Sequence, residues 1–164
     1  MTPTSVRDIR NLSLLGQSGS GKTTLLEKLL AAAGAIGSPG SVEKGDTVSD
    51  YDAQEKAFGH SLNSSLAHLE WAEHWVNVLD TPGLPDFLGR ALATLPAVET
   101  AVVVVNAAAG VETVTRKAME AAADKCRMVV VNRIDAPGVD FGALMERITA
   151  TFGKECLPIN LPTA

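Results

Sequence analysis

The run Gly-Gln-Ser-Gly-Ser-Gly-Lys-Thr at residues 16–23 constrains this chain more than any other feature. It follows a short apolar segment (11–15) and opens a helix-like stretch (22–33) rich in leucine and alanine. Glycines let backbone N–H groups converge on an anion, and a helix N-terminus adds further unpaired N–H groups. The alternative is an ordinary Gly/Ser turn that caps a helix. The pattern predicts a phosphate-binding loop made of Gly16, Gln17, Ser18, Gly19, Ser20, Gly21, Lys22, Thr23 and Thr24.

Two side chains of this run indicate the phosphate-bearing ligand more closely. Lys22 would place an ammonium on the outer two phosphates of a nucleotide, where it acts in catalysis. The Thr23 hydroxyl would ligate a Mg²⁺ ion that bridges those phosphates. The loop therefore predicts a nucleotide held together with magnesium.

Strand-like and helix-like segments alternate along the chain, which predicts an α/β fold with a doubly wound, mostly parallel sheet. Two segments around the turn at 72–74 predict one antiparallel hairpin. Apolar runs at 100–106 and 127–132 are typical of strands buried on both faces. The long polar stretch 34–60 is expected to be a functional or mobile loop. The expected strands are 11–15, 62–69, 75–79, 100–106 and 127–132, the expected helices 22–33, 86–94, 111–123 and 141–152, and 155–161 is expected to be extended.

Composition sets the class of protein. A chain of 164 residues with 46% hydrophobic residues predicts a single globular domain. The net charge of −5 argues against broad nucleic-acid binding, and no direct DNA binding is expected. The chain contains no run of 18 apolar residues, so the sequence predicts no membrane-spanning helix. Cys126 and Cys156 stand in apolar surroundings and predict two buried free thiols, which suits a cytoplasmic location.

A second motif, Asp80-Thr-Pro-Gly83, ends the second strand of the predicted hairpin. An aspartate at a strand end beside a phosphate loop can hold magnesium through water. The glycine can give its N–H to a terminal phosphate and act as a hinge when that phosphate leaves. The alternative is a plain turn. We expect Asp80 at the metal and Gly83 at the reacting phosphate.

A third motif, Asn132-Arg-Ile-Asp135, follows the strand at 127–132. A carboxylate here can accept hydrogen bonds from the N1–H and 2-amino group of guanine. Adenine has neither donor, and an unpaired buried carboxylate would penalise it. The alternative is an Asx turn at the end of a strand. Asn132, Arg133 and Asp135 are therefore expected to bind guanine.

The three motifs, in this order, resemble the GTP-binding domain of translational GTPases, most closely elongation factor G and its paralogues. The resemblance covers essentially the whole chain. It implies GTP or GDP with Mg²⁺ as ligands, the ribosome as partner of the full-length parent, and two switch segments near 37–62 and 83–94. It also implies an N-terminal fragment, because the family's final strand and helix of this domain and its later domains are not visible.

The chain departs from the family pattern at three positions. Ser61 stands where the family has a threonine that ligates magnesium, and its hydroxyl keeps that capacity. Arg133 replaces a lysine and keeps its charge. Leu84 replaces the histidine that orients the attacking water, so hydrolysis is expected to fall toward about 10⁻⁴ per second. The three histidines of the chain are expected on the surface or the hairpin: His60, His68 and His74.

Two alternatives to a GTPase remain open. One is a regulatory paralogue that binds guanine nucleotide without hydrolysing it, which Leu84 and Ser61 favour. The other is an ATP-using phosphate-loop enzyme such as a kinase. The motif at residues 132–135 argues against the kinase, because its aspartate matches guanine and not adenine.

Overall fold

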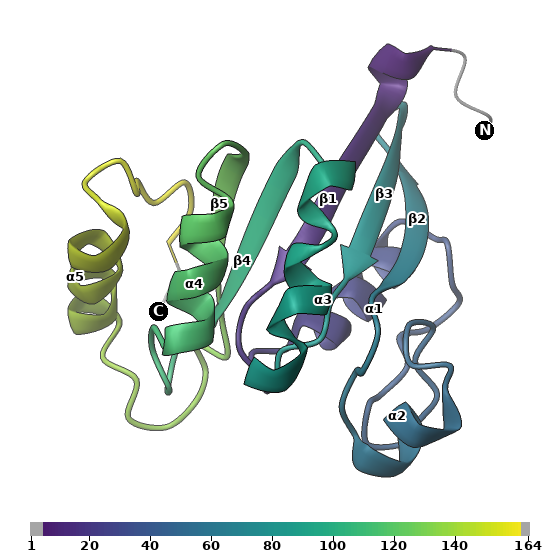
Figure 1. Ribbon diagram of the computed structural model, residues 1–164, viewed down its shortest axis with the longest axis horizontal. Coiled ribbons are helices and arrows are strands. Elements are labelled where there is room, and N and C mark those ends of the chain that lie inside the picture. The colour runs from purple at the N-terminus through teal and green to yellow at the C-terminus, as the bar shows by residue number, and fades with distance from the viewer. Residues whose placement is uncertain (1–4, 162–164) are drawn as a thin grey trace.

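The computed structural model describes residues 5–161, which form a five-stranded sheet flanked by helices (Figure 1). The strand order is β2-β3-β1-β4-β5. The strands are β1 (Ile9–Leu15), β2 (Ser65–Trp71), β3 (His74–Asp80), β4 (Thr100–Asn106) and β5 (Cys126–Asn132). The helices are α1 (Lys22–Ala32), α2 (Ala53–Phe58), α3 (Leu88–Leu92), α4 (Thr113–Ala121) and α5 (Phe141–Phe152), with short 3₁₀ turns η1 (Val6–Asp8), η2 (Pro85–Phe87) and η3 (Leu95–Ala97).

The sheet is parallel except at one edge. β1 pairs in parallel with β3 and β4, and β4 pairs in parallel with β5, whereas β2 and β3 form an antiparallel hairpin. Ala72 and Glu73 turn the hairpin with positive φ values of 47° and 64°, the conformation that a tight two-residue turn between twisted strands requires. The predicted doubly wound sheet with one antiparallel hairpin is confirmed.

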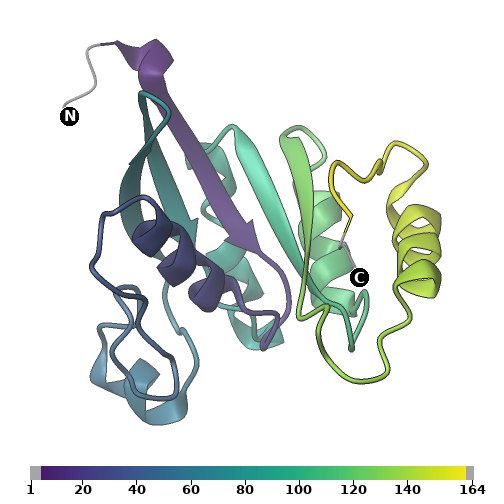
Figure 2. The ribbon, with the colours of Figure 1, turned by 180° about the vertical axis from the view of Figure 1, so that it is seen from behind.

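Helices cover both faces of the sheet (Figures 1 and 2). On one face α1 packs through Leu26 and Leu30 onto buried residues of β1, β3 and β4. On the other face α3 and α4 pack through Ala91 and Ala118 onto the opposite sides of β1 and β4. The two layers account for the strong burial of β4, in which residues 101–105 are at most 5% exposed.

β5 is a strand, as predicted, but it is not buried on both faces. Its first three residues, Cys126, Arg127 and Met128, are exposed, and the rest are half-buried. The reason is that β5 lies at the sheet edge and pairs only with β4. The prediction of two buried thiols is therefore wrong for Cys126, which is exposed, while Cys156 is half-buried; both are free.

The segment between α1 and β2 also differs from expectation because it contains a helix, α2. Asp52 caps this helix by accepting a hydrogen bond from the Gln54 N–H, and Glu55 reaches back to the Asp52 N–H. Such a reciprocal pair satisfies the free N–H groups of a helix start and makes a very short helix possible. Residues 155–161, expected to be extended, form no strand. Within residues 5–161, no helix has the length and apolar character needed to cross a bilayer.

Candidate functional site

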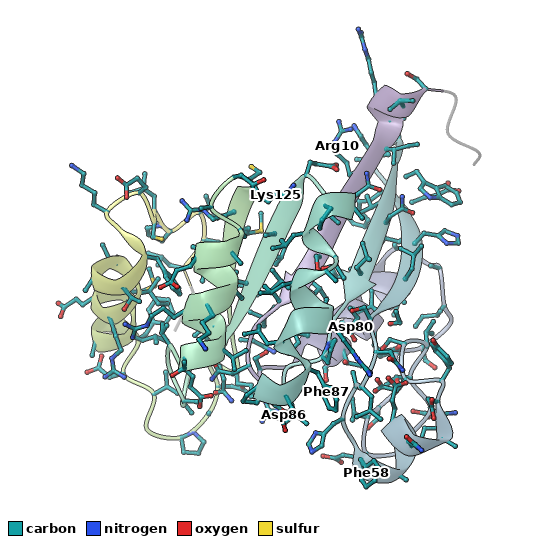
Figure 3. All side chains as sticks on the ribbon, in the orientation of Figure 1. Arg10, Phe58, Asp80, Asp86, Phe87 and Lys125 are labelled. Carbon is teal, nitrogen blue, oxygen red and sulfur yellow. The ribbon has the colours of Figure 1, made fainter. Side chains whose placement is uncertain are left out.

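The three motifs meet at one edge of the sheet. Because β1, β3, β4 and β5 run parallel, their carboxyl ends lie at the same edge, and ligands of open α/β sheets bind there. Asp80, the last residue of β3, lies at this edge, above the segment that carries α2 and Phe58 (Figure 3). The phosphate loop leaves β1 at the same edge.

The loop lies close against the sheet, and two of its glycines are required for that. Gly16 has φ 132°, and a Cβ there would sit 2.4 Å from the Val104 carbonyl oxygen. Gly21 has φ 90°, and a Cβ there would sit 2.3 Å from Asn132 Nδ2. Side chains are excluded at both positions by conformation and by space. Gly21 caps α1, so the first turn of this helix opens from the loop.

Lys22 supplies the positive charge of the site. Its Nζ donates hydrogen bonds of 2.9 Å to the carbonyl oxygens of Gly16 and Gln17, and the side chain is buried. Burial lowers the pKa of Lys22 to about 8, against the opposing attraction of Asp80. An ammonium held by two backbone carbonyls is a fixed partner for a phosphate group.

Two hydroxyls and two carboxylates form the opposite side of the site. Thr23 Oγ1 donates to Asp80 Oδ2 over 2.6 Å, and Ser61 Oγ donates to Asp50 Oδ1 over 2.7 Å. The two hydroxyl oxygens lie 3.5 Å apart. Since each donates its one proton to a carboxylate, each hydroxyl oxygen keeps lone pairs that can accept from a ligand. Such oxygens are ligands that Mg²⁺ prefers.

Asp80 is the most deeply buried carboxylate of this group. It is 1% exposed, and its Oδ1 atom has no hydrogen-bond partner among the described residues. Burial raises the pKa of Asp80 to about 6, although the Thr23 hydrogen bond and the charge of Lys22 oppose the rise. Residues 5–161 contain no cluster of three His, Cys, Asp or Glu side chains able to hold a metal alone. A Mg²⁺ ion beside these side chains would complete its coordination with other oxygens, such as those of water or phosphate.

Buried carboxylates anchor the segment between α1 and β2 over the site. Glu27 of α1 is fully buried and accepts the Gly40 and Val48 N–H groups at 2.7 and 2.6 Å. Asp50 is 4% exposed and accepts the Thr47 hydroxyl as well as that of Ser61. No sequence motif predicted a role for Glu27 or Asp50. Asp50 lies eleven residues before Ser61 in an acidic run, and this position was the signal in the sequence that could have pointed to its role.

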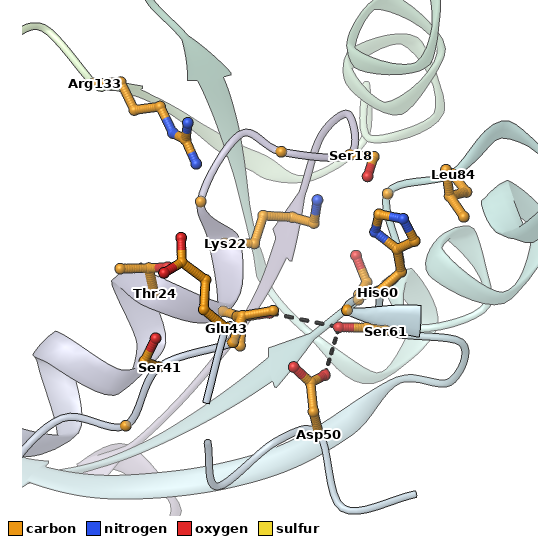
Figure 4. Close-up of a pocket in the computed structure, with 18 residues that line it drawn as sticks. Ser18, Lys22, Thr24, Ser41, Glu43, Asp50, His60, Ser61, Leu84 and Arg133 are labelled. Atoms are coloured by element: carbon orange, nitrogen blue, oxygen red, sulfur yellow. Dashed lines mark hydrogen bonds between the residues drawn. The ribbon is translucent and has the colours of Figure 1, made fainter. Parts of the chain in front are cut away.

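These elements enclose a cavity of about 450 Å³ (Figure 4). Six of the predicted phosphate-loop residues line it, whereas Gly16, Gln17 and Ser20 do not. Gln17 points away, accepting a hydrogen bond from Thr115 and donating to the Gly110 carbonyl oxygen. The cavity wall consists of Ser18, Gly19, Gly21, Lys22, Thr23, Thr24, Gly40, Ser41, Val42, Glu43, Asp50, Gly59, His60, Ser61, Thr81, Gly83, Leu84 and Arg133.

The segment predicted to recognise guanine joins the site only in part. Asn132 Nδ2 donates to the Ser20 carbonyl oxygen over 2.9 Å, while its Oδ1 accepts the Arg133 N–H. Arg133 adopts a left-handed φ of 58° and lines the cavity. Asp135 is exposed and lies outside the cavity wall. Asn132 thus ties this segment to the phosphate loop, whereas Asp135 is exposed and not buried as the prediction from the sequence assumed.

The second motif lies against the phosphate loop. A Cβ on Gly83 would sit 2.5 Å from Lys22 Nζ and 2.6 Å from the Ser18 N–H nitrogen. Leu84, next along the chain, lines the cavity together with His60. His68 stacks on Trp75 at 4.4 Å between ring centroids, and His74 bonds the Ala72 carbonyl in the hairpin turn. The expectation of surface or hairpin positions is confirmed for all three histidines, and the exposed His60 also lines the cavity.

A parallel sheet with a phosphate loop after its first strand, and an aspartate and an asparagine at the ends of β3 and β5, defines a phosphate-loop nucleotide-binding domain. The family model described as the elongation factor Tu GTP binding domain matches residues 7–160. The chain belongs to this family, whose ligand class is guanine nucleotide.

Individual relatives agree with this assignment. The elongation factor G-like protein of Mycobacterium tuberculosis is 36% identical over 94% of this chain and 22% of its own length. The mitochondrial ribosome-releasing factor 2 of Culex quinquefasciatus is 35% identical over 95% of this chain and 21% of its own. The chain thus spans about a fifth of the curated relatives it matches.

Solved structures agree on the fold. A protein of Thermus thermophilus superposes with a TM-score of 0.90 at 41% identity, covering 95% of this chain and 24% of that one. A bacterial selenocysteine-specific elongation factor superposes with a TM-score of 0.70 at 21% identity, over 91% of this chain and 24% of the other. At that identity the second match speaks for the fold alone.

Proposed function

We propose that these 164 residues form one GTP-binding domain that hydrolyses GTP within an elongation factor G-like translation factor acting on the ribosome. The observation that supports this best is that six residues of the phosphate loop, the Ser61 hydroxyl with its partner Asp50, and residues of both predicted switch segments line a single cavity. The names of the relatives support the ribosome as partner. The Culex relative is named mitochondrial, so the predicted cytoplasmic location is tested separately by cell fractionation.

The proposed roles follow the geometry of the cavity. Lys22 and the backbone of Gly83 contact the terminal phosphate. Gly83 lies directly beside Lys22 Nζ and the backbone nitrogen of Ser18 in the phosphate loop, so both groups can reach the same phosphate. Thr23 and Ser61 ligate Mg²⁺, with Asp80 holding it through water. Bound Mg²⁺ would neutralise charge on the outer phosphates as it does in related enzymes. Asn132, Arg133 and Asp135 receive the guanine.

The test is a calorimetric titration of GTP, GDP and ATP with and without Mg²⁺. GTP and GDP are expected to bind at least tenfold more tightly than ATP. Asp135→Asn is expected to weaken GTP binding by about tenfold or more, since it removes a charged hydrogen-bond acceptor. Asp124→Asn, at an exposed aspartate outside the cavity, is the matched control. Equal binding of GTP and ATP would refute the proposal.

The second candidate is a domain that binds guanine nucleotide without hydrolysing it, and Leu84 in the cavity wall favours it. Leucine has no group that can hold a water molecule. Both candidates predict guanine-selective binding, and only the first predicts phosphate release above the rate of GTP in buffer. Measuring phosphate release with Mg²⁺ and ribosomes separates the two.

A further inference from the structure

His60 is an exposed residue that lines the cavity together with Lys22 and Leu84. It lies between α2 and β2, and its ring points into the cavity between the side chains of Lys22 and Leu84 (Figure 4). Thr24, Ser41 and Glu43 lie on the other side of Lys22 in the same view. The imidazole therefore faces the end of the site that the Lys22 ammonium marks.

The backbone around His60 is held on both sides by one buried glutamate. The Gly59 and His60 N–H groups donate to the Glu55 carbonyl oxygen at 2.8 and 3.3 Å. The Leu62 and Asn63 N–H groups donate to Glu55 Oε1 at 2.9 and 3.0 Å. Glu55 is 2% exposed, so these bonds are shielded from water. Residue 60 is presented at a fixed place beside the phosphate loop.

The residue after His60 extends this anchoring into the metal site. Ser61 bonds Asp50 and lies 3.5 Å from Thr23. The ring of His60, in contrast, has no hydrogen-bond partner among the described residues. Its two nitrogens are free to accept and donate. Of the other groups at this end of the cavity, Leu84 offers no polar atom, and Asp50 already accepts hydroxyls from Ser61 and Thr47.

We propose that His60 is the catalytic residue that orients the attacking water, a role that rests on the proposed GTP hydrolysis. A ring nitrogen accepts a hydrogen bond from the water, whose oxygen forms a bond to the terminal phosphorus. The bond from that phosphorus to the bridging oxygen breaks, and its electron pair leaves with GDP. The proton of the water passes to an oxygen of the departing phosphate, so His60 positions the water without being consumed.

This role would allow a chain with Leu84 after Gly83 to hydrolyse GTP. The water is held from the segment before β2 instead of from the segment after β3. Because the holding group and the metal-facing Ser61 are adjacent in sequence, closure of one segment over the nucleotide brings both into place.

The test compares His60→Ala and His60→Gln with the protein itself, with His68→Ala as the control for a histidine outside the cavity. GTP affinity and single-turnover hydrolysis are measured with Mg²⁺, with and without ribosomes. His60→Ala is expected to slow hydrolysis by about 100-fold, the scale on which a misplaced reacting group slows an enzyme. GTP affinity is expected to change by less than about threefold, since the ring contacts the water and not the nucleotide. His60→Gln, whose amide oxygen can accept a hydrogen bond, is expected to keep an intermediate rate.

Three outcomes would overturn the assignment. Unchanged hydrolysis in His60→Ala would remove His60 from catalysis and leave the GTPase proposal standing. Parallel losses of affinity and rate would show that His60 only supports the cavity. Hydrolysis by the unaltered protein no faster than that of GTP in buffer, despite tight GTP binding, would leave a binding module. Failure to bind GTP at all would instead refute the proposed function.

Discussion

Replacing Glu27 by glutamine tests whether a buried carboxylate holds the segment over the nucleotide site. Its two oxygens accept the Gly40 and Val48 N–H groups at 2.7 and 2.6 Å, and the side chain is fully buried. Glutamine keeps the shape and the helix propensity. It offers one acceptor oxygen, and its NH₂ group faces the second N–H donor, which is left unsatisfied.

The magnitude follows from that lost bond. A hydrogen bond to a charged group contributes about 1.5–3 kcal/mol, and a buried donor without a partner adds to the cost. We expect Glu27→Gln to destabilise the attachment of residues 40–48 by about 2 kcal/mol, which corresponds to about 30-fold in an opening equilibrium. We expect the segment to detach without unfolding the sheet, so that most of this loss is local.

Native-state hydrogen exchange measures this opening directly. The amides of Gly40 and Val48 are expected to exchange about 30-fold faster in Glu27→Gln, while those of β4 keep their protection. Glu120→Gln, an exposed glutamate on α4, is the control and is expected to change neither. Unchanged protection at both amides would refute the anchoring role of Glu27. Equal loss across β4 would show that the carboxylate supports the whole fold instead.

Three further predictions test the site and the edge strand. Burial raises the pKa of Asp80 from 3.8 to about 6, so between these values the folded state keeps a proton that the unfolded chain releases. The free energy of unfolding of the ligand-free protein is therefore expected to fall by about 3 kcal/mol as the pH rises from about 4 to about 6. Urea denaturation should show this loss in the protein and not in Asp80→Asn; equal pH dependence would contradict it. Gly83→Ala is expected to weaken GTP binding more than tenfold in a fluorescence titration, because its Cβ would lie 2.5 Å from Lys22 Nζ, whereas Gly89→Ala, with open space around it, is expected to bind normally. A thiol reagent should modify Cys126 rapidly and Cys156 slowly in the native protein, and equal rates would contradict the exposed edge of β5.

Local patterns in the sequence determined the elements and the core of the site. β4 and α5 begin and end where the apolar run and the helical spacing predict, and the phosphate loop follows β1 as expected. These features depend on neighbours a few residues away: glycines that allow a close turn, a continuous apolar run, and apolar side chains three and four positions apart. The convergence of the three motifs follows equally from parallel strands, whose carboxyl ends share an edge.

Tertiary structure decided what depends on distant partners. The apolar run of β5 resembles that of β4, yet β5 has one neighbouring strand and is half exposed, because burial is a property of neighbours and not of composition. Glu27 looks like an ordinary helix glutamate until its partners, 13 and 21 residues further on, are seen. His60 likewise carries no local signal. Its place is set by Glu55, which binds the backbone on both sides of it, and only the folded chain shows that the residue lines the cavity.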